Sequence, residues 1–159
     1  EISSDNKNMD ENIISVDYVD GFSMLINKEK FKDEDFFDES FFLYLENTDL
    51  CLRTKKRGQN IFIIKNSFID HAGAGSIVSK DLEYLRNWHW MWSKFYFNKK
   101  HYGYFNAFSK IISNLLSAMF KYVFYLILFN SYKKKIYLMR ICGLYNSIIG
   151  KKSWLRIND

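Results

Sequence analysis

Short apolar runs separated by charged turns make up the first half of the chain. Residues 1–15 form a polar lead rich in Asn, Asp and Ser, a composition typical of disorder. Residues 15–26 predict one or two strands, and residues 27–31 predict the start of a short helix. The first half therefore combines strands with short helices.

The second half is dominated by helical periodicity. In residues 81–97, Leu82, Leu85 and either Trp88 or His89 fall on one side of a predicted helix. The rest of the chain is expected to form two or three further helices. Their breaks are predicted near Tyr102-Gly103, Asn130-Ser131 and Gly150.

An acidic helix behind an aromatic run, in residues 36–53, is the most informative pattern. Glu46, Asp49 and Arg53 stand at i, i+3 and i+7, so they share one face of a predicted helix, on which Asp49 and Arg53 can form an i,i+4 ion pair. Glu46 lies at the helix N-terminus, where the helix dipole favours a negative charge. Burial beside an aromatic wall raises a carboxyl pKa toward the range of a general base. From the spacing alone, an ordinary amphipathic helix with a surface salt bridge ranks ahead of a catalytic face.

The predicted helix ends at Gly58, because three cations precede a glycine suited to a left-handed cap. Residues 60–65 then predict a short buried strand that leads into a loop, residues 70–76, with one histidine, His71. In α/β folds such a loop borders the ligand crevice, and its glycines let a ligand approach. His71 is a candidate ligand-binding residue, with a structural role as the alternative.

Four segments follow one another in a recognisable order: VDGFSMLI at residues 19–26, FDESFFLY at 37–44, ENTDLCLR at 46–53 and HAGAGS at 71–76. They resemble the family 2 glycosyltransferases, in particular the rhamnosyltransferase-like bacterial branch. That pattern runs roughly as FDE-x-FF-x-Y-x-ED-x-DLC-x-R followed by H-x-G-G-x-S. The resemblance covers residues 16–76 well and the remainder loosely.

The resemblance implies an α/β fold. Residues 1–78 would be the C-terminal, acceptor-side part of a GT-A, Rossmann-like catalytic domain, and residues 79–159 a mainly helical, basic and aromatic extension. It also implies inverting transfer of a sugar from a nucleotide-sugar to a lipid-linked or polysaccharide acceptor in cell-surface glycan synthesis. A divalent cation, Mn²⁺ or Mg²⁺, would hold the departing diphosphate, with His71 near the metal.

The resemblance assigns roles to the residues of this sequence that stand at the family's site positions. Asn47 stands where the family has the catalytic aspartate of a Glu-Asp pair. Asp49 and Arg53 match the second acid and the arginine that brace the helix, while Asp20 and Gly21 match a loop on the acceptor side.

Asn47 departs from the family pattern. An amide does not accept a proton at neutral pH as a carboxylate does, so the usual base is missing unless Glu46 or Asp49 substitutes. Three explanations stay open: Glu46 takes over the role, the protein is catalytically weak or inactive, or the chain is a diverged or engineered copy.

The sequence also departs from the family pattern in its donor-binding motif. The family binds its donor and metal with an Asp-x-Asp motif after an earlier strand, whereas the triplet Asp33-Glu34-Asp35 reads as a solvated turn. We therefore expect the donor-binding half on an N-terminal segment missing from this chain, which alone is not expected to catalyse transfer. Arg86 is a candidate for bidentate contact with the donor phosphates, with a surface arginine as the alternative.

Composition agrees with about one domain of 159 residues, since 48% of the residues are hydrophobic. Cys51 and Cys142 lie far apart with no metal-type spacing, as expected of reduced thiols in a cytosolic protein.

Charge divides the chain. Residues 1–78 hold 9 Lys and Arg against 15 Asp and Glu, a net charge of −6, and residues 79–159 hold 14 against 3, a net charge of +11. Lysine pairs and triplets flank apolar runs in the second part, which favours an anionic membrane surface. No nucleic-acid motif accompanies the lysines, so nucleic acid ranks low.

The apolar residues 111–129 come close to the length of a membrane span, but Lys121 would cost about 2.5–3.5 kcal/mol at a helix centre. We therefore expect an interfacial or core-packed helix, and a cytoplasmic protein peripheral to the inner face of the cell membrane. Two alternatives to an acceptor-side enzyme remain. One is a catalytically inactive remnant, and the other is a membrane-surface interaction module.

Overall fold

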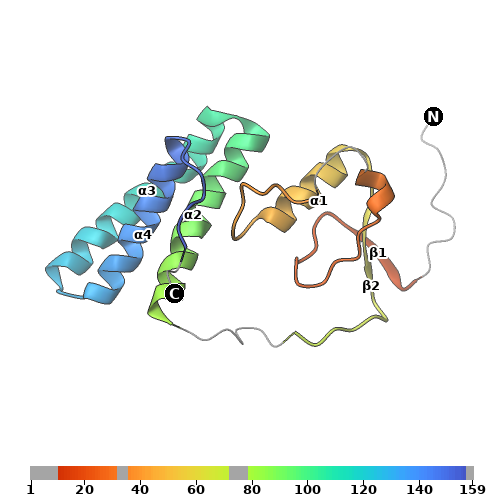
Figure 1. The fold of residues 1–159 in the computed structure, drawn as a ribbon, viewed down its shortest axis with the longest axis horizontal. Helices are drawn as coiled ribbons and strands as arrows, with labels where there is room; N and C mark the ends of the chain where they lie inside the picture. Colours follow the sequence, from red (N-terminus) through yellow and green to blue (C-terminus); the bar gives the residue numbers. More distant parts are fainter. Residues whose placement is uncertain (1–10, 32–35, 72–78, 157–159) are drawn as a thin grey trace. The chain divides into compact units, whose positions relative to one another are not determined.

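Helices account for most of the computed structural model, which describes residues 11–31, 36–71 and 79–156. These residues divide into two compact units. Unit 1 lies within residues 1–37 and 47–73, and unit 2 within residues 38–46 and 74–159. The described residues form four α-helices, one short 3-10 helix and two short strands. Their order along the chain can be followed in Figure 1.

Unit 1 contains a two-stranded antiparallel sheet. Strand β1, Ile13–Val16, pairs with β2, Ile61–Ile64, so that Ile13 lies opposite Ile64 and Val16 opposite Ile61. The 3-10 helix η1 spans Lys28–Phe31, where the short helix was predicted. The sheet is small, and its strands come from distant parts of the sequence.

Helix α1, Glu46–Lys56, has the predicted position. Its first residue, Glu46, belongs to unit 2, and the remainder belongs to unit 1. Gly58 has a φ of +72° and donates its N–H to the carbonyl of Lys55 at 2.9 Å, which satisfies one of the last helix carbonyls. The predicted left-handed glycine cap is confirmed.

The prediction that residues 60–65 form a buried strand is wrong in one respect. The strand exists as β2, but Phe62, Ile63 and Ile64 are each more than 40% exposed. Within the described residues β2 pairs with β1 alone, and no further layer covers the faces of this sheet. A β-branched apolar run predicts a strand, but it does not fix what packs against the strand.

Unit 2 is built on three helices joined by tight turns: α2, Lys80–Tyr102; α3, Tyr104–Ile127; and α4, Ser131–Ile148. They lie side by side in Figure 1, and all three pack against one another. The predicted breaks are confirmed. Gly103 separates α2 from α3 with a φ of +85°, and the Asn130 side chain caps α4 by accepting from the N–H of Lys133 at 3.0 Å.

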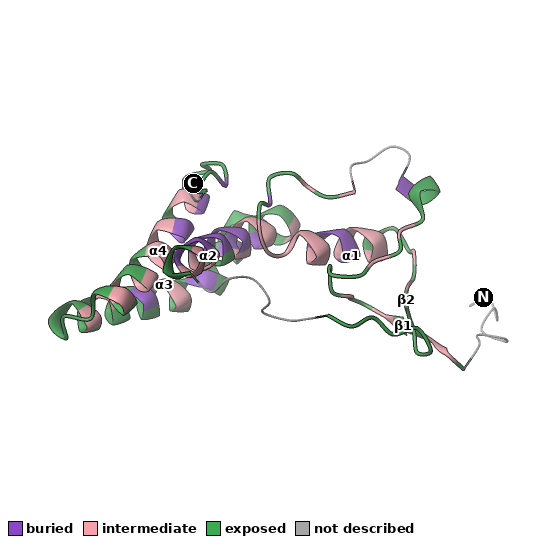
Figure 2. Ribbon diagram, turned by 60° about the horizontal axis from the view of Figure 1, so that its bottom comes forward, coloured by how far each residue is buried: buried purple, intermediate pink, exposed green. Residues whose placement is uncertain are grey.

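Five buried side chains form the core where the three helices meet: Met91, Phe95, Ala107, Ile111 and Leu144. Buried positions recur along α2, as Figure 2 shows. Helices α2 and α4 approach each other closely at Gly143, since a Cβ added there would lie 2.2 Å from the carbonyl oxygen of Trp88. One turn later, Ser147 donates its hydroxyl to the carbonyl of Trp92 at 2.9 Å.

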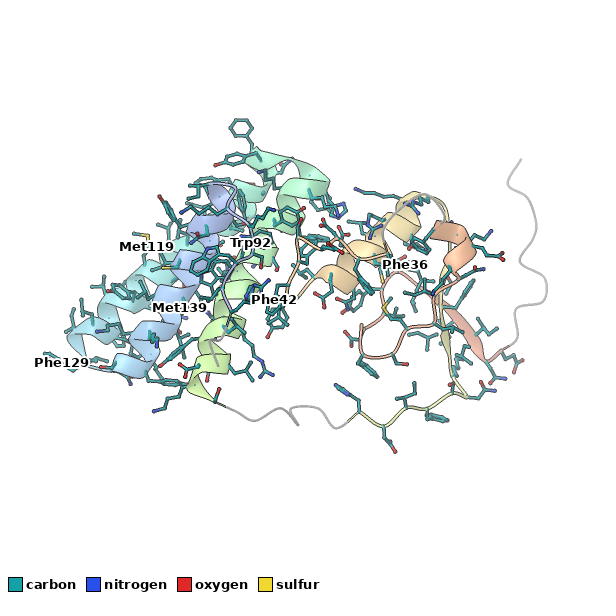
Figure 3. The ribbon with its side chains drawn as sticks, viewed as in Figure 1. Phe36, Phe42, Trp92, Met119, Phe129 and Met139 are labelled. Atoms are coloured by element: carbon teal, nitrogen blue, oxygen red, sulfur yellow. The ribbon has the colours of Figure 1, made fainter. Side chains whose placement is uncertain are left out.

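Two segments outside α2, α3 and α4 complete unit 2 along α2. In residues 38–46, the Leu43 carbonyl accepts from Ser93 at 2.8 Å, and Phe41 meets the Tyr96 ring edge-on. The C-terminal segment, residues 149–156, supplies the Lys151 carbonyl as acceptor for the indole N–H of Trp92 at 2.9 Å. Phe42 and Trp92 are labelled in Figure 3.

The predicted α/β fold is wrong. A GT-A, Rossmann-like domain needs a parallel sheet with helical crossovers, whereas the described residues are mainly helical and contain one antiparallel pair of strands. The described apolar residues elsewhere in the first half form loops, η1 or α1 instead of further strands. The disordered lead predicted over residues 1–15 is wrong for residues 13–15, which belong to β1. The strands predicted over residues 15–26 are also wrong, since β1 ends at Val16 and residues 17–26 form no strand. Three predicted features lie outside the described residues: residues 1–10 of the lead, the acidic turn over residues 33–35 and the glycine-rich residues 72–76.

Candidate functional site

Asn47 in α1 begins a series of side-chain hydrogen bonds in unit 1. Its amide nitrogen donates to the hydroxyl oxygen of Tyr18 at 3.0 Å, and to the carbonyl of Val19 at 3.4 Å. The Tyr18 hydroxyl in turn donates to Oδ1 of Asp20 at 2.6 Å. This hydrogen bond to the Asp20 carboxylate raises the pKa of Tyr18 above the usual value, because it favours the protonated phenol.

Gly21 allows the loop that follows β1 to approach α1. A Cβ added at Gly21 would lie 3.2 Å from the Cβ of Asn47, tighter than ordinary van der Waals contact. The structure thus brings together Asp20, Gly21 and Asn47, which the resemblance assigns to the acceptor side and to the position of the base. Tyr18, which connects Asp20 to Asn47, was not among the predicted site residues.

Asp49 and Arg53 form the predicted i,i+4 ion pair. Oδ2 of Asp49 lies 2.8 Å from Nε of Arg53, and Asp49 is fully buried while the Arg53 side chain is 15% exposed. Arg53 also donates to the carbonyl of Phe36, which is labelled beside α1 in Figure 3. Asp49 thus pairs with the arginine that bonds α1 to the segment before it, so the position of Asp49 suits a brace better than a base.

Glu46 begins α1 after an unusual backbone in unit 2. Tyr44 and Leu45 both adopt left-handed φ values, 69° and 68°, which non-glycine residues rarely do. Oε2 of Glu46 is buried, and no described residue gives it a hydrogen bond. A buried carboxylate oxygen without a partner is costly, so it stands out as an acceptor that could receive a proton or a donor from outside the chain.

Arg86 and Glu46 act on the same group, the Tyr44 hydroxyl. Burial raises the pKa of Tyr44, the positive charge of Arg86 lowers it, and the negative charge of Glu46 raises it. The Tyr44 ring meets the Trp90 ring edge-on, with centroids 5.4 Å apart. Two of the predicted site residues, on different elements of unit 2, therefore lie within electrostatic reach of one phenol.

His71 lies on an exposed stretch of unit 1 and stacks on Phe22, with ring centroids 4.7 Å apart and planes 5° from parallel. Among residues 11–31, 36–71 and 79–156, no three His, Cys, Asp or Glu side chains converge in a way that could hold a metal ion. The described residues therefore offer no such group of ligands, and Mn²⁺ or Mg²⁺ stays an expectation from the resemblance.

His89 is a buried group that the sequence did not single out for a role. Nε2 lies 2.8 Å from the carbonyl oxygen of Leu155, and Nδ1 lies 2.9 Å from the hydroxyl of Ser153. Burial lowers the pKa of His89, the hydrogen bond to Leu155 raises it and the nearby charge of Arg156 lowers it, with a net decrease. The side chain therefore joins α2 to the C-terminal segment and offers no open nitrogen to a ligand.

Comparison of the chain with protein-family models, with curated proteins and with solved structures finds no match. The family resemblance consequently stands on the four motifs alone.

Proposed function

We propose that this chain takes part in glycosyl transfer from a nucleotide-sugar to a hydroxyl of a glycan or lipid-linked acceptor, with Glu46 as the general base. The observation that carries the proposal is the buried, unpartnered Oε2 of Glu46. Glu46 precedes Asn47 directly in the sequence, and Asn47 stands at the family's base position.

In this reaction the acceptor O–H gives its proton to the Glu46 carboxylate while the oxygen bonds to the anomeric carbon. The bond from that carbon to the diphosphate breaks, and the nucleoside diphosphate leaves with the bonding electrons. A base helps only if it is ionised and short of competing donors. Oε2 meets the second condition, since it is buried and no described residue donates to it.

The backbone before Glu46 also supports a functional constraint. Left-handed φ values cost about 1–3 kcal/mol each in non-glycine residues and persist where the surroundings hold them. Tyr44 and Leu45 are such a pair, and the segment is held in unit 2 by the hydrogen bond from Ser93 to the Leu43 carbonyl and by the contact of Tyr44 with Trp90. Strain of this kind clusters at sites where the position of one side chain matters.

A non-catalytic role is the second candidate, and the state of Asn47 favours it. Its amide is engaged by Tyr18 and Val19, so position 47 makes structural contacts. A remnant that kept its shape after losing a base would look the same at this position. The two candidates differ in what happens when Glu46 loses its charge.

The test uses membranes from cells that carry or lack the gene, supplied in turn with each of a set of radiolabelled nucleotide-sugars. Transfer that depends on the gene, and that Glu46→Gln lowers by about 10²–10⁴-fold, is the expected result. Glu39→Gln is the matched control, because Glu39 is an exposed glutamate on the same segment of unit 2.

Full transfer by the Glu46→Gln variant would rule out Glu46 as the base. No gene-dependent transfer from any nucleotide-sugar would instead favour the non-catalytic candidate. Asn47→Asp separates the two further: an increase in transfer is expected if position 47 still faces the reacting hydroxyl.

A further inference from the structure

Helix α3 carries an apolar stripe on the side that faces away from its neighbours. Seven large apolar residues recur at spacings of three or four and are all exposed, so they occupy one helix face. These residues, named the α3 outer stripe, are Phe105, Phe108, Ile112, Leu116, Phe120, Val123 and Ile127. Phe105 is 88% exposed and Phe120 71%, values far from those of a core.

The opposite side of α3 already has its partners. Ala107, Ile111 and Ala118 are buried, and the first two belong to the core shared with α2 and α4. Repacking within unit 2 would therefore have to break this core to cover the stripe. Within the described residues, α3 is the one helix long and apolar enough to cross a membrane by length and composition, with only 11% of its apolar window buried. An exposed apolar face of this length marks an interaction site.

The charge around the stripe identifies the class of partner. From Tyr84 to Asn158 the sequence has 13 lysines and arginines and no aspartate or glutamate. A surface that joins an apolar face to uncompensated positive charge complements anionic phospholipid, which offers acyl chains beneath a layer of negative headgroups. We propose that the α3 outer stripe lies in the interfacial layer of an anionic lipid bilayer, with the lysines beside it on the headgroups.

Three lysines lie on or next to α3, where they can reach the headgroup layer. Lys110 sits over the Tyr102 ring at 4.1 Å from its centroid, next to the start of α3, and Lys121 and Lys133 sit over Tyr137 and Tyr125 toward its end. Lys110 and Lys121 thus lie within the length of the stripe, and Lys133 lies beyond its end. The exposed ring of Phe129 follows the end of α3, as Figure 3 shows.

Helix α3 lies along the bilayer instead of spanning it. Lys110 and Lys121 belong to α3, and each would cost about 2.5–3.5 kcal/mol at the centre of a span. The middle of α3 also accepts a charged hydrogen bond from α2, since Nζ of Lys94 donates to Oδ1 of Asn114 at 2.8 Å. A span would place this pair in hydrocarbon, whereas an interfacial helix keeps it on the side that faces α2.

The test measures binding of the purified full chain to vesicles of phosphatidylcholine alone and of phosphatidylcholine with phosphatidylglycerol. Tight binding to the anionic vesicles, weakened by salt, is expected. Leu116→Glu with Phe120→Glu should lower the partition coefficient by at least about tenfold, because both charges enter the apolar layer. Tyr145→Glu with Ile149→Glu is the matched control, since it adds the same charges at exposed positions of unit 2 outside the stripe and should retain more of the binding.

Circular dichroism of both double variants checks that they fold, and single variants at Leu116 and Phe120 replace the pair if it does not. Equal binding by the stripe variant, or absence of wild-type binding, overturns the proposal. Equal binding to neutral vesicles overturns the role of charge. Self-association that the stripe variant abolishes, in place of vesicle binding, would show that a second copy of the chain covers the stripe. The stripe holds none of the proposed site residues, so loss of binding and loss of transfer are separate outcomes.

Discussion

Nδ1 of His89 lies 2.9 Å from the hydroxyl oxygen of Ser153, although 64 residues separate them in the sequence. The other ring nitrogen lies 2.8 Å from the carbonyl oxygen of Leu155. Because a carbonyl can only accept, Nε2 carries the proton and Nδ1 accepts from Ser153. A neutral histidine thus has both nitrogens satisfied in the interior of unit 2.

Ser153→Ala should destabilise unit 2. The change leaves Nδ1 of the fully buried His89 without its donor, and an unsatisfied buried acceptor costs about 1–3 kcal/mol. Chemical unfolding followed by tryptophan fluorescence measures the loss. Ser113→Ala, at an exposed position of α3, should change the unfolding free energy far less. Equal effects of the two substitutions would contradict the pairing.

Unit 2 should lose stability as the pH falls below about 6.5. His89 has a pKa of 6.5 when unfolded and a lower one in the folded protein, because burial disfavours its charged form. Its contribution is complete above the unfolded pKa, and it is lost as the pH falls toward the folded pKa, since the unfolded chain then binds the proton more tightly. Thermal unfolding at a series of pH values checks this. The His89→Gln variant is expected to melt lower throughout but with a flatter slope below pH 6.5. An unchanged slope would show that His89 does not set it.

Asp38 should contribute stability at neutral pH and lose it in acid. Burial raises the pKa of this carboxyl, but hydrogen bonds from Lys100, Ser40 and Tyr96 outweigh burial and lower the pKa from 3.8 to about 2. The contribution is therefore full above pH 3.8 and disappears between there and about pH 2. Asp38→Asn should lower the melting temperature at pH 7 more than at pH 2. A difference that does not shrink in acid would mean that the charge is not what stabilises the segment.

Gly143→Ala should destabilise unit 2 although alanine is the better helix former. The added methyl would lie 2.2 Å from the Trp88 carbonyl oxygen, so α2 and α4 would have to move apart. Overpacking of this kind costs about 1–3 kcal/mol and outweighs the roughly 1 kcal/mol gained in helix propensity. Urea unfolding measures the balance, with Ser117→Ala on the exposed side of α3 as control. A more stable Gly143→Ala variant would show that the two helices can separate at little cost.

Arg53→Met should loosen α1 in unit 1. It leaves the fully buried Asp49 without its main countercharge, and breaking a buried pair costs about 3–5 kcal/mol. Hydrogen exchange at the α1 amides should rise accordingly. Adding Asp49→Asn should restore part of the protection, because no buried charge then remains. Protection that stays lost in the double variant would assign the effect to packing of the arginine instead of its charge.

Local elements were readable from the sequence because local rules determine them. The α1 boundaries followed from the acidic start and the Gly58 cap, and the three helices of unit 2 followed from periodicity and from the breaks at Gly103 and Asn130. The ion pair of Asp49 with Arg53 followed from spacing alone.

The tertiary packing around a helix or strand does not follow from its local sequence, and the wrong predictions concern this packing. The apolar residues 61–64 suit a buried strand of an α/β sheet, yet they form the exposed β2. The contacts of His89 with Ser153 and of Tyr18 with Asn47 join residues 64 and 29 positions apart. No spacing rule connects such positions, although a histidine predicted on the apolar side of a helix was a signal that its ring needed polar partners.

Unit 2 is assembled from segments that lie far apart in the sequence, which determines when it can fold during synthesis. Residues 38–46 leave the ribosome before any part of α2, yet their partners Ser93, Tyr96 and Lys100 are all in α2. The residues that follow them, from 47 on, belong to unit 1, so the segment has to wait through the synthesis of that stretch. Unit 2 is closed only when residues 149–156 have also been released. A newly made chain can therefore finish unit 1 early, but it completes unit 2 only after residues 149–156 have been made.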